Sequence, residues 1–212
     1  MTPFKLTCNI GTPIQLGNHP LHLDGLLYWL AESYTDKPIT VLDVVLAKQD
    51  GIYKASALAF APTLLEIVTY RSTRHPTCWT WNEWNMPLNI KSIVQKGGQY
   101  RARLTDYHAH VCSQVVFFGV GDIAKIKAIM ATCQGLGRNS NQGMGEITSF
   151  EIEPTDQDYS WFMDGQLMRA LPLELIPVEI DKSTAIEGVT SIAPPYKSTS
   201  ETQTLSPVFL KV

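Results

Sequence analysis

The chain has 212 residues, of which 44% are hydrophobic and 17% charged, and its formal net charge is −3. This composition is typical of a globular protein long enough to bury one large core or two small ones. It holds no run of eighteen apolar residues, and the N-terminus lacks a basic flank followed by an apolar block, so we expect neither a membrane span nor a signal peptide. The scattered cysteines suit reduced thiols, and we expect a cytoplasmic location.

The charge is distributed unevenly along the chain. Residues 91–142 contain seven Lys or Arg and two acids, a balance of +5, so the rest of the chain carries −8. Many of the acids lie in residues 151–187. Local potential decides whether a phosphate backbone is attracted, so the negative net charge does not exclude nucleic-acid binding.

The first strand and helix are predicted near the N-terminus. Residues 4–10 alternate apolar and polar side chains, which indicates a strand. After a Gly- and Pro-rich loop, Asp24 is placed to cap a helix that ends near Ser33. His22, just before this helix, is either an ordinary loop histidine or part of a binding site.

Further strands are predicted at residues 40–47, 55–61 and 65–70, with a turn at residues 49–51. Three tryptophans then lie within six positions, at Trp79, Trp81 and Trp84. Strand alternation would place Trp79 and Trp81 on one face. They are either core residues or a stacking platform for bases.

A basic hairpin is predicted near residue 100. Two glycines are followed by Tyr100, which alternates with Arg101 and Arg103. Side chains two residues apart on a strand point the same way, so both arginines face one surface. That surface either contacts a nucleic acid or is simply solvated.

His108 and His110 are the most plausible catalytic pair, because histidine titrates near neutrality and can deprotonate a ribose hydroxyl. However, no neighbouring Lys or second acid completes a catalytic set, and histidines are ordinary near a hairpin bend. His75 and Cys78 make only half of a zinc site. We therefore expect no catalysis, no metal and no cofactor.

A strand, a helix, a glycine-rich loop and another strand follow in order. Residues 115–120 are continuously apolar, which predicts a strand buried on both faces. Asp122 is placed to cap a helix over residues 122–133, and residues 146–153 are rich in strand formers. The loop between that helix and the last strand spans residues 135–145.

The glycine-rich loop is the main candidate for a binding site. Glycine lets a backbone approach another molecule closely, and exposed amides with an arginine can hold phosphate. The loop closes a helix rather than opening one, which argues against a dinucleotide fingerprint or a P-loop. The alternative is a mobile surface turn. The candidate residues are Gly135, Gly137, Arg138, Asn139, Asn141, Gln142, Gly143 and Gly145.

The order of strand, Gly-Asp at a helix start, and G-x-G-R-x-x-x-x-G-x-G loop before a last strand resembles the RAMP superfamily of CRISPR-associated RNA-binding proteins. The Leu-Asp-Gly-Leu-Leu run at residues 23–27 and the short chain most resemble the small Cas-five-like subunit of type IV CRISPR effector complexes. The resemblance spans roughly residues 4–153.

The resemblance implies an α+β protein with a ferredoxin-like (RRM-type) core and an irregular C-terminal segment. Residues 1–153 would form this domain, with an inserted hairpin region at about 72–110. Residues 154–212 would be an extension, partly disordered or docked on the body.

The same resemblance implies a non-catalytic subunit that binds and caps the 5′ handle of the CRISPR RNA through the glycine-rich loop, His22 and the Tyr100–Arg103 hairpin. Its partners would be the repeated backbone subunit, the large subunit and, indirectly or near the targeting motif, target DNA. One alternative is the RNA-processing endonuclease of the superfamily, with His108, His110 or His22 as base. Another is an RNA-binding module unrelated to CRISPR.

Overall fold

The structure, a computed structural model, describes residues 1–61, 66–74, 103–196, 201–208 and 210–212. They form two units, one of residues 1–66 and 110–212 and one of residues 67–109, and each is considered by itself. None of the helices in this described part of the chain is both long enough and apolar enough to cross a membrane.

Helices in these residues are α1 (Leu23–Glu32), α2 (Pro38–Val45) and α3 (Ile123–Met130), with short 3₁₀ helices η3 (Ser140–Gln142), η4 (Leu173–Leu175) and η5 (Lys182–Thr184). The strands are β1 (Thr2–Ile10), β2 (Lys48–Gln49), β3 (Ile52–Tyr53), β4 (Ala59–Phe60), β5 (Glu66–Arg74), β6 (Arg103–Val111), β7 (Gln114–Gly121), β8 (Ile147–Pro154), β9 (Phe162–Met163), β10 (Gln166–Leu167), β11 (Leu171–Pro172), β12 (Ala185–Ser191), β13 (Glu201–Pro207) and β14 (Leu210–Lys211). The predicted α+β class is confirmed.

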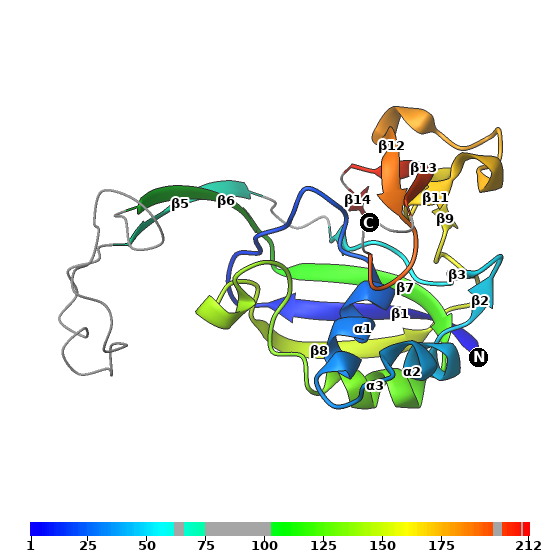
Figure 1. Cartoon of the computed structure of the whole chain (residues 1–212), viewed down its shortest axis with the longest axis horizontal. Helices are drawn as coiled ribbons and strands as arrows, with labels where there is room; N and C mark the ends of the chain where they lie inside the picture. The colour runs from blue at the N-terminus through cyan, green and yellow to red at the C-terminus, as the bar shows by residue number, and fades with distance from the viewer. Residues whose placement is uncertain (62–65, 75–102, 197–200, 209) are drawn as a thin grey trace, which may run out of the picture. The chain divides into compact units, whose positions relative to one another are not determined.

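The larger unit is built on a five-stranded mixed sheet with the order β14-β4-β7-β1-β8 (Figure 1). β14 runs parallel to β4, whereas the other neighbouring strands are antiparallel. Strand β1, which lies between β7 and β8, alternates as predicted, and its Phe4, Leu6 and Cys8 side chains are fully buried. They join one core with apolar residues of α1, α2 and α3, so the three helices cover the same face of the sheet.

β7 is buried on both faces, as predicted. Val115 and Phe117 belong to the core beneath the helices, whereas Val116 and Phe118 belong to a cluster on the opposite face. That second cluster includes Met168, which comes from the chain after β8. The continuous apolar run of β7 therefore reflects two cores that meet at one strand.

α3 begins as predicted. The Asp122 carboxylate accepts a hydrogen bond from the Lys125 backbone N–H at 3.2 Å and so satisfies a donor that the first helical turn leaves free. Ile126, Ile129 and Met130 form its buried stripe.

The strand predicted at residues 40–47 is wrong. This segment forms α2, which has Pro38 in its first turn and buries Pro38, Leu42 and Val45 on one side. Proline is favoured at that position because a first-turn N–H has no helical partner. The β-branched residues of the segment suggested a strand, but burial at helical spacing prevailed. The strand predicted at residues 55–61 is shorter, since only β4 forms a regular pair.

The chain after β8 has ordered structure of its own. β9 and β10 form a hairpin, and β11, β13 and β12 form a three-stranded antiparallel sheet (Figure 1). A separate small core holds Trp161, Leu167, Leu171 and Leu205 together with Ile52. The last strand, β14, returns to the edge of the main sheet. The C-terminal part thus packs on the domain at several points.

Met168→Ala tests whether this packing contributes to the stability of the domain. Met168 is fully buried, so its truncation should lower the free energy of unfolding by about 2–5 kcal/mol in urea titrations. Val178→Ala is the control, because Val178 is 93% exposed and should change stability by no more than about 0.5 kcal/mol. An unchanged midpoint for Met168→Ala would mean that the segment after β8 is only an appended arm.

Candidate nucleic-acid interface

The glycine-rich loop is hydrogen-bonded to the loop that joins β1 to α1. We call residues 11–17 and 134–146 together the loop pair. The hydrogen bonds between them include Arg138 N to Gln15 O at 2.7 Å, Asn139 Nδ2 to Gln15 Oε1 at 2.6 Å, Gly145 N to Pro13 O at 2.9 Å and Thr12 Oγ1 to Gly143 O at 2.7 Å. These bonds join the backbone of the glycine-rich loop to the loop between β1 and α1. The glycine-rich loop is therefore packed against the protein and is not a free surface turn.

Two of the loop glycines are needed for contact with the chain itself. Gly137 and Gly145 have φ values of 81° and 62°, a region that favours glycine. A Cβ at Gly137 would collide with the carbonyl oxygen of Gln15, and one at Gly145 with that of Leu136. Because these two residues have no side chain, the backbone segments of the loop pair can lie in direct contact.

Gly143 differs from these two glycines. Its φ is 86°, and no atom of the described chain lies within 4 Å of the position that a Cβ would take. Next to it, Asn141 and Gln142 are exposed at the end of η3. This tip of the loop thus has two exposed amide side chains and a glycine with free space beside it, although the Gly143 N–H donates to Ser140 O and its carbonyl oxygen accepts from Thr12.

Arg138 lies exposed on the same loop and is held by its neighbours. Its backbone pairs with Gln15, and its guanidinium covers Gly17, where an added Cβ would be 3.2 Å from Nε. Among the described residues, its side chain makes neither an ion pair nor a hydrogen bond. The guanidinium is therefore positioned and available to an anion.

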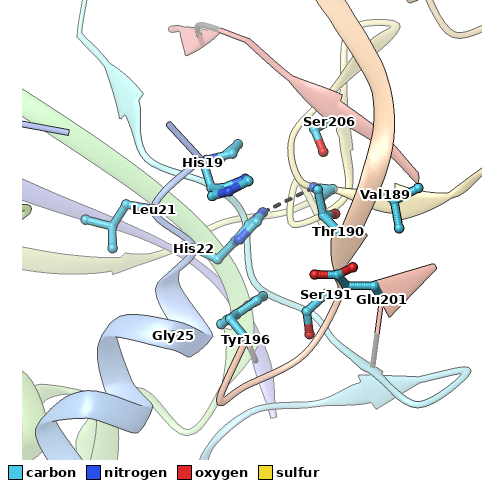
Figure 2. A pocket seen from close by; sticks show the side chains of 12 residues that line it. His19, Leu21, His22, Gly25, Val189, Thr190, Ser191, Tyr196, Glu201 and Ser206 are labelled. Atoms are coloured by element: carbon cyan, nitrogen blue, oxygen red, sulfur yellow. Dashed lines mark hydrogen bonds between the residues drawn. The ribbon is translucent and has the colours of Figure 1, made fainter. Parts of the chain in front are cut away.

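Two adjoining cavities run from Arg138 to the C-terminal sheet. The first, of about 290 Å³, is lined by Arg138, Leu16 and Trp29 among others. The second, of about 300 Å³, lies between the start of α1 and strands β12 and β13 (Figure 2). Both are lined by His19, Pro20, Leu21 and Gly25, so we describe them as one groove.

A buried ion pair fixes the start of α1 behind this groove. Arg169 and Asp24 are both fully buried, and Nη2 lies 3.4 Å from the Asp24 carboxylate. The other carboxylate oxygen of Asp24 accepts the Tyr196 hydroxyl at 2.7 Å. Arg169 also donates to the carbonyl oxygens of four residues: Tyr53, Ala55, Ala170 and Ile192. Nearly every donor of the guanidinium has an acceptor, as a buried cation requires.

The prediction that Asp24 caps α1 is therefore wrong. The helix begins two residues earlier, at Leu23, His22 takes the cap position without a side-chain cap, and Asp24 is buried in the protein. The next residue, Gly25, packs against the same cluster, because a Cβ at this position would lie only 2.9 Å from the Tyr196 ring. The Leu-Asp-Gly run thus accommodates an ion pair and an aromatic ring from the C-terminal part of the chain.

The ionisation of this cluster follows from its burial. Burial alone would lower the pKa of Arg169, but Asp24 and Tyr196 together raise it above the usual value, so the guanidinium stays charged. Burial and the Asp24 carboxylate raise the pKa of Tyr196 well above its usual value, so the phenol keeps the proton that it donates.

His22 lies at the boundary of the ion pair and the groove. Its Nε2 accepts the Ala170 backbone N–H at 3.2 Å, and its ring stacks on Tyr196 with centroids 5.4 Å apart (Figure 2). Burial, Arg169 and His19 lower its pKa well below the usual value, so the imidazole is neutral. Since Nε2 is occupied, His22 can offer a ligand only its ring edge and Nδ1.

Part of the predicted hairpin site lies outside the described residues. Tyr100, Arg101 and the side chain of Arg103 are in this category, as are Trp79, Trp81, Trp84, His75 and Cys78. In the smaller unit, β5 and β6 are paired, and Arg71 contacts Asp106 at 2.9 Å while Thr69 Oγ1 is 3.3 Å from His108 Nδ1.

The remaining titratable candidates show features of structural residues. Burial lowers the pKa of His110, which is partly buried against Phe60. Cys8 and Cys112 are buried free thiols whose pKa values burial raises to about 12 and about 11, so they are poor nucleophiles. Within the residues that the structure describes, no three His, Cys, Asp or Glu side chains come together to hold a metal ion.

Sequence reasoning did not identify Arg169, Tyr196, Gln15 or Trp29. Asp24 and Arg169 are 145 positions apart, so no local spacing links them. The only signal was an acidic residue followed by glycine at a helix start, and this pattern is typical of a cap as well. Trp29 gave no signal, because a tryptophan in an amphipathic helix usually faces the core.

Asp24→Asn tests the buried ion pair. The substitution leaves the Arg169 cation buried without a countercharge, so the free energy of unfolding should fall by about 3–5 kcal/mol in urea. Asp43→Asn is the matched control: the ion pair of Asp43 with Lys48 is solvent-exposed, and its loss should cost about 0–1 kcal/mol. Equal losses in the two variants would contradict a special role for Asp24.

Gly145→Ala and Gly143→Ala test the different roles of the loop glycines. Both place an alanine at positive φ, which costs about 1–2 kcal/mol. Gly145→Ala should cost about 1–3 kcal/mol more, because its Cβ meets the Leu136 carbonyl oxygen while the Cβ of Gly143→Ala meets open space. The free energies of unfolding of the two variants are compared by chemical denaturation. Equal values would show that the backbone around Gly145 can shift to accommodate a Cβ at little cost.

Residues 2–207 match the model of a protein family described as CRISPR type IV associated protein Csf3. The match covers both units and both members of the loop pair. No curated protein matches the sequence.

Proposed function

The chain belongs to the CRISPR type IV associated Csf3 family, and we therefore propose that it is a non-catalytic subunit that binds and caps the 5′ handle of the CRISPR RNA in a type IV effector complex. The observation that carries the proposal is Arg138, an exposed guanidinium that lines the groove with Gly135 and Gly137 and makes no ion pair with any described residue. Such a cation at the edge of a groove suits a phosphate chain.

The topology supports a ferredoxin-like interpretation of the domain. Along the chain, β1, α1, β4, β7, α3 and β8 follow the strand-helix-strand-strand-helix-strand order of such folds. In the sheet these strands lie in the order β8-β1-β7-β4. In this proposal residues 1–153 are the ferredoxin-like domain, residues 72–110 its insertion and residues 154–212 its extension.

The face of the sheet away from the helices is a poor surface for RNA in this chain, because the C-terminal part packs against β7 on that face. RRM domains stack bases on aromatic side chains of their sheet. Here Glu153 lies opposite Lys5 and Glu151 opposite Thr7 on the face away from the helices. Acids at these positions repel phosphate, so the loop pair and the groove are the better interface.

The exposed amides of Asn141 and Gln142 would supply the donors at the tip of the loop, where the Gly143 backbone is already bonded to Ser140 and Thr12. Asn139, by contrast, uses its amide to hold Gln15 and acts as a support. Tyr100, Arg101 and Arg103 remain the proposed second contact. Strand alternation in the sequence predicts that both arginines share one face, and there they would hold phosphates.

We propose no catalytic step for this subunit. His22 is neutral, with one ring nitrogen occupied by Ala170. His108 is exposed and contacts Thr69, and no described acid or lysine is hydrogen-bonded to it. The repeated backbone subunit and the large subunit are the proposed protein partners, and target DNA would be reached through the assembled complex.

Arg138→Ala should weaken binding of handle RNA by roughly tenfold or more, because a hydrogen-bonded charge is lost. It should also lower the slope of log affinity against log salt by about one unit or less, since one phosphate contact is removed. Arg138→Lys should restore the slope better than the affinity, because an ammonium cannot make a forked contact. The measurement is RNA affinity at several salt concentrations.

Lys182→Ala is the charge-matched control, because Lys182 is exposed on η5 and lines neither cavity. It should leave affinity and slope close to wild type. The double variant Arg101→Ala/Arg103→Ala tests the hairpin in the same assay. If Arg138→Ala behaves like Lys182→Ala, the loop pair is not the RNA site.

A further inference from the structure

The first cavity combines three features that suit one particular kind of ligand. On one side it has the Arg138 guanidinium, which no described residue neutralises. On another it has Trp29, a large aromatic side chain that is 56% exposed although it belongs to a helix of the core layer. Between them, Leu16, Pro20 and Leu21 supply a partly buried apolar lining.

Trp29 requires an explanation because its neighbours on α1 are buried. Leu26, Leu27 and Leu30 are buried, whereas Trp29 is exposed and lines the first cavity together with Leu26. An exposed tryptophan ring loses the stabilisation that burial would give it. An exposed aromatic ring and an unneutralised cation in the lining of one cavity are the features by which proteins hold single-stranded nucleic acid.

The Arg138 side chain is also restricted in position. Its backbone N–H is bonded to Gln15, and Gly17 leaves room for the guanidinium because it has no Cβ. The backbone of Arg138 is thus anchored, and its guanidinium lies over Gly17 in the lining of the cavity.

We propose that this cavity is a subsite for one unpaired nucleotide, with its base stacked on Trp29 and its phosphate on Arg138. A volume of about 290 Å³ is at the lower end of small-molecule pockets, roughly 300–1,000 Å³, and accommodates one nucleotide rather than a run of them. His19, which lines both cavities, marks the path toward the second. The subsite rests on the proposed RNA-binding function. It specifies where one base of the bound RNA is unstacked from its neighbours and held by the protein.

The test uses the full-length protein, or the assembled complex, and single-stranded handle RNA in which each nucleotide in turn is replaced by an abasic one. Trp29→Ala should weaken binding of intact RNA about five- to hundredfold, the range measured for loss of one base stack. Trp29→Phe should retain most of the affinity. Because stacking is not ionic, the salt slope of Trp29→Ala should stay that of wild type while Arg138→Ala lowers it.

The abasic series identifies the stacked base. At one position the abasic RNA should bind wild type as weakly as intact RNA binds Trp29→Ala, and combining the two changes should cost nothing further. Tyr34→Ala is the matched control, because Tyr34 is also 56% exposed but lines neither cavity. It should behave as wild type, and all variants should unfold at the wild-type temperature.

The possible failures are distinguishable. If Arg138→Ala weakens binding but Trp29→Ala does not, the phosphate contact and the proposed function stand and the base subsite is wrong. If Trp29→Ala weakens binding equally for every abasic RNA, Trp29 does not stack on one base, which also overturns the subsite. If wild type shows no affinity for handle RNA, the proposed function itself is wrong.

Discussion

The buried ion pair between Arg169 and Asp24 is the interaction on which the rest of the structure depends. Asp24 belongs to α1 and Arg169 to the segment between β10 and β11, so the pair joins two segments that are 145 positions apart in the chain. Burying two charges is costly and pays only when their remaining hydrogen-bonding groups are satisfied. Here carbonyl oxygens from several segments and the Tyr196 hydroxyl complete the set.

The pair also determines the shape of the surface. It fixes the start of α1, and with it His19, Pro20 and Leu21, against the wall formed by β12 and β13. The other end of this segment continues into the loop pair, where Gln15 holds Arg138. A buried ion pair that contacts no ligand thus positions both walls of the groove. The glycine-rich loop is oriented by its hydrogen bonds to the loop between β1 and α1.

The sequence predicted those elements whose local pattern agrees with their final environment. β1 alternates, β7 is apolar throughout and α3 has its Asp122 cap, and each of these formed as expected. The prediction was wrong for α2, where β-branched residues outweighed Pro38, and for Asp24, whose partner is distant in the chain. Glycine spacing predicted the candidate loop. The structure adds that a Cβ at Gly137 or Gly145 would collide with a backbone carbonyl, whereas a Cβ at Gly143 would meet no atom of the described chain.

Ultraviolet cross-linking of the assembled complex to its CRISPR RNA, read out by mass spectrometry, tests the central claim most directly. The account predicts that handle nucleotides cross-link to peptides of the loop pair and to the α1 peptide that contains Trp29. These cross-links should disappear with Arg138→Ala at raised salt. Handle cross-links confined to β1 and β8, on the face with Glu151 and Glu153, would contradict it, because the RNA would then occupy the open sheet face instead of the groove.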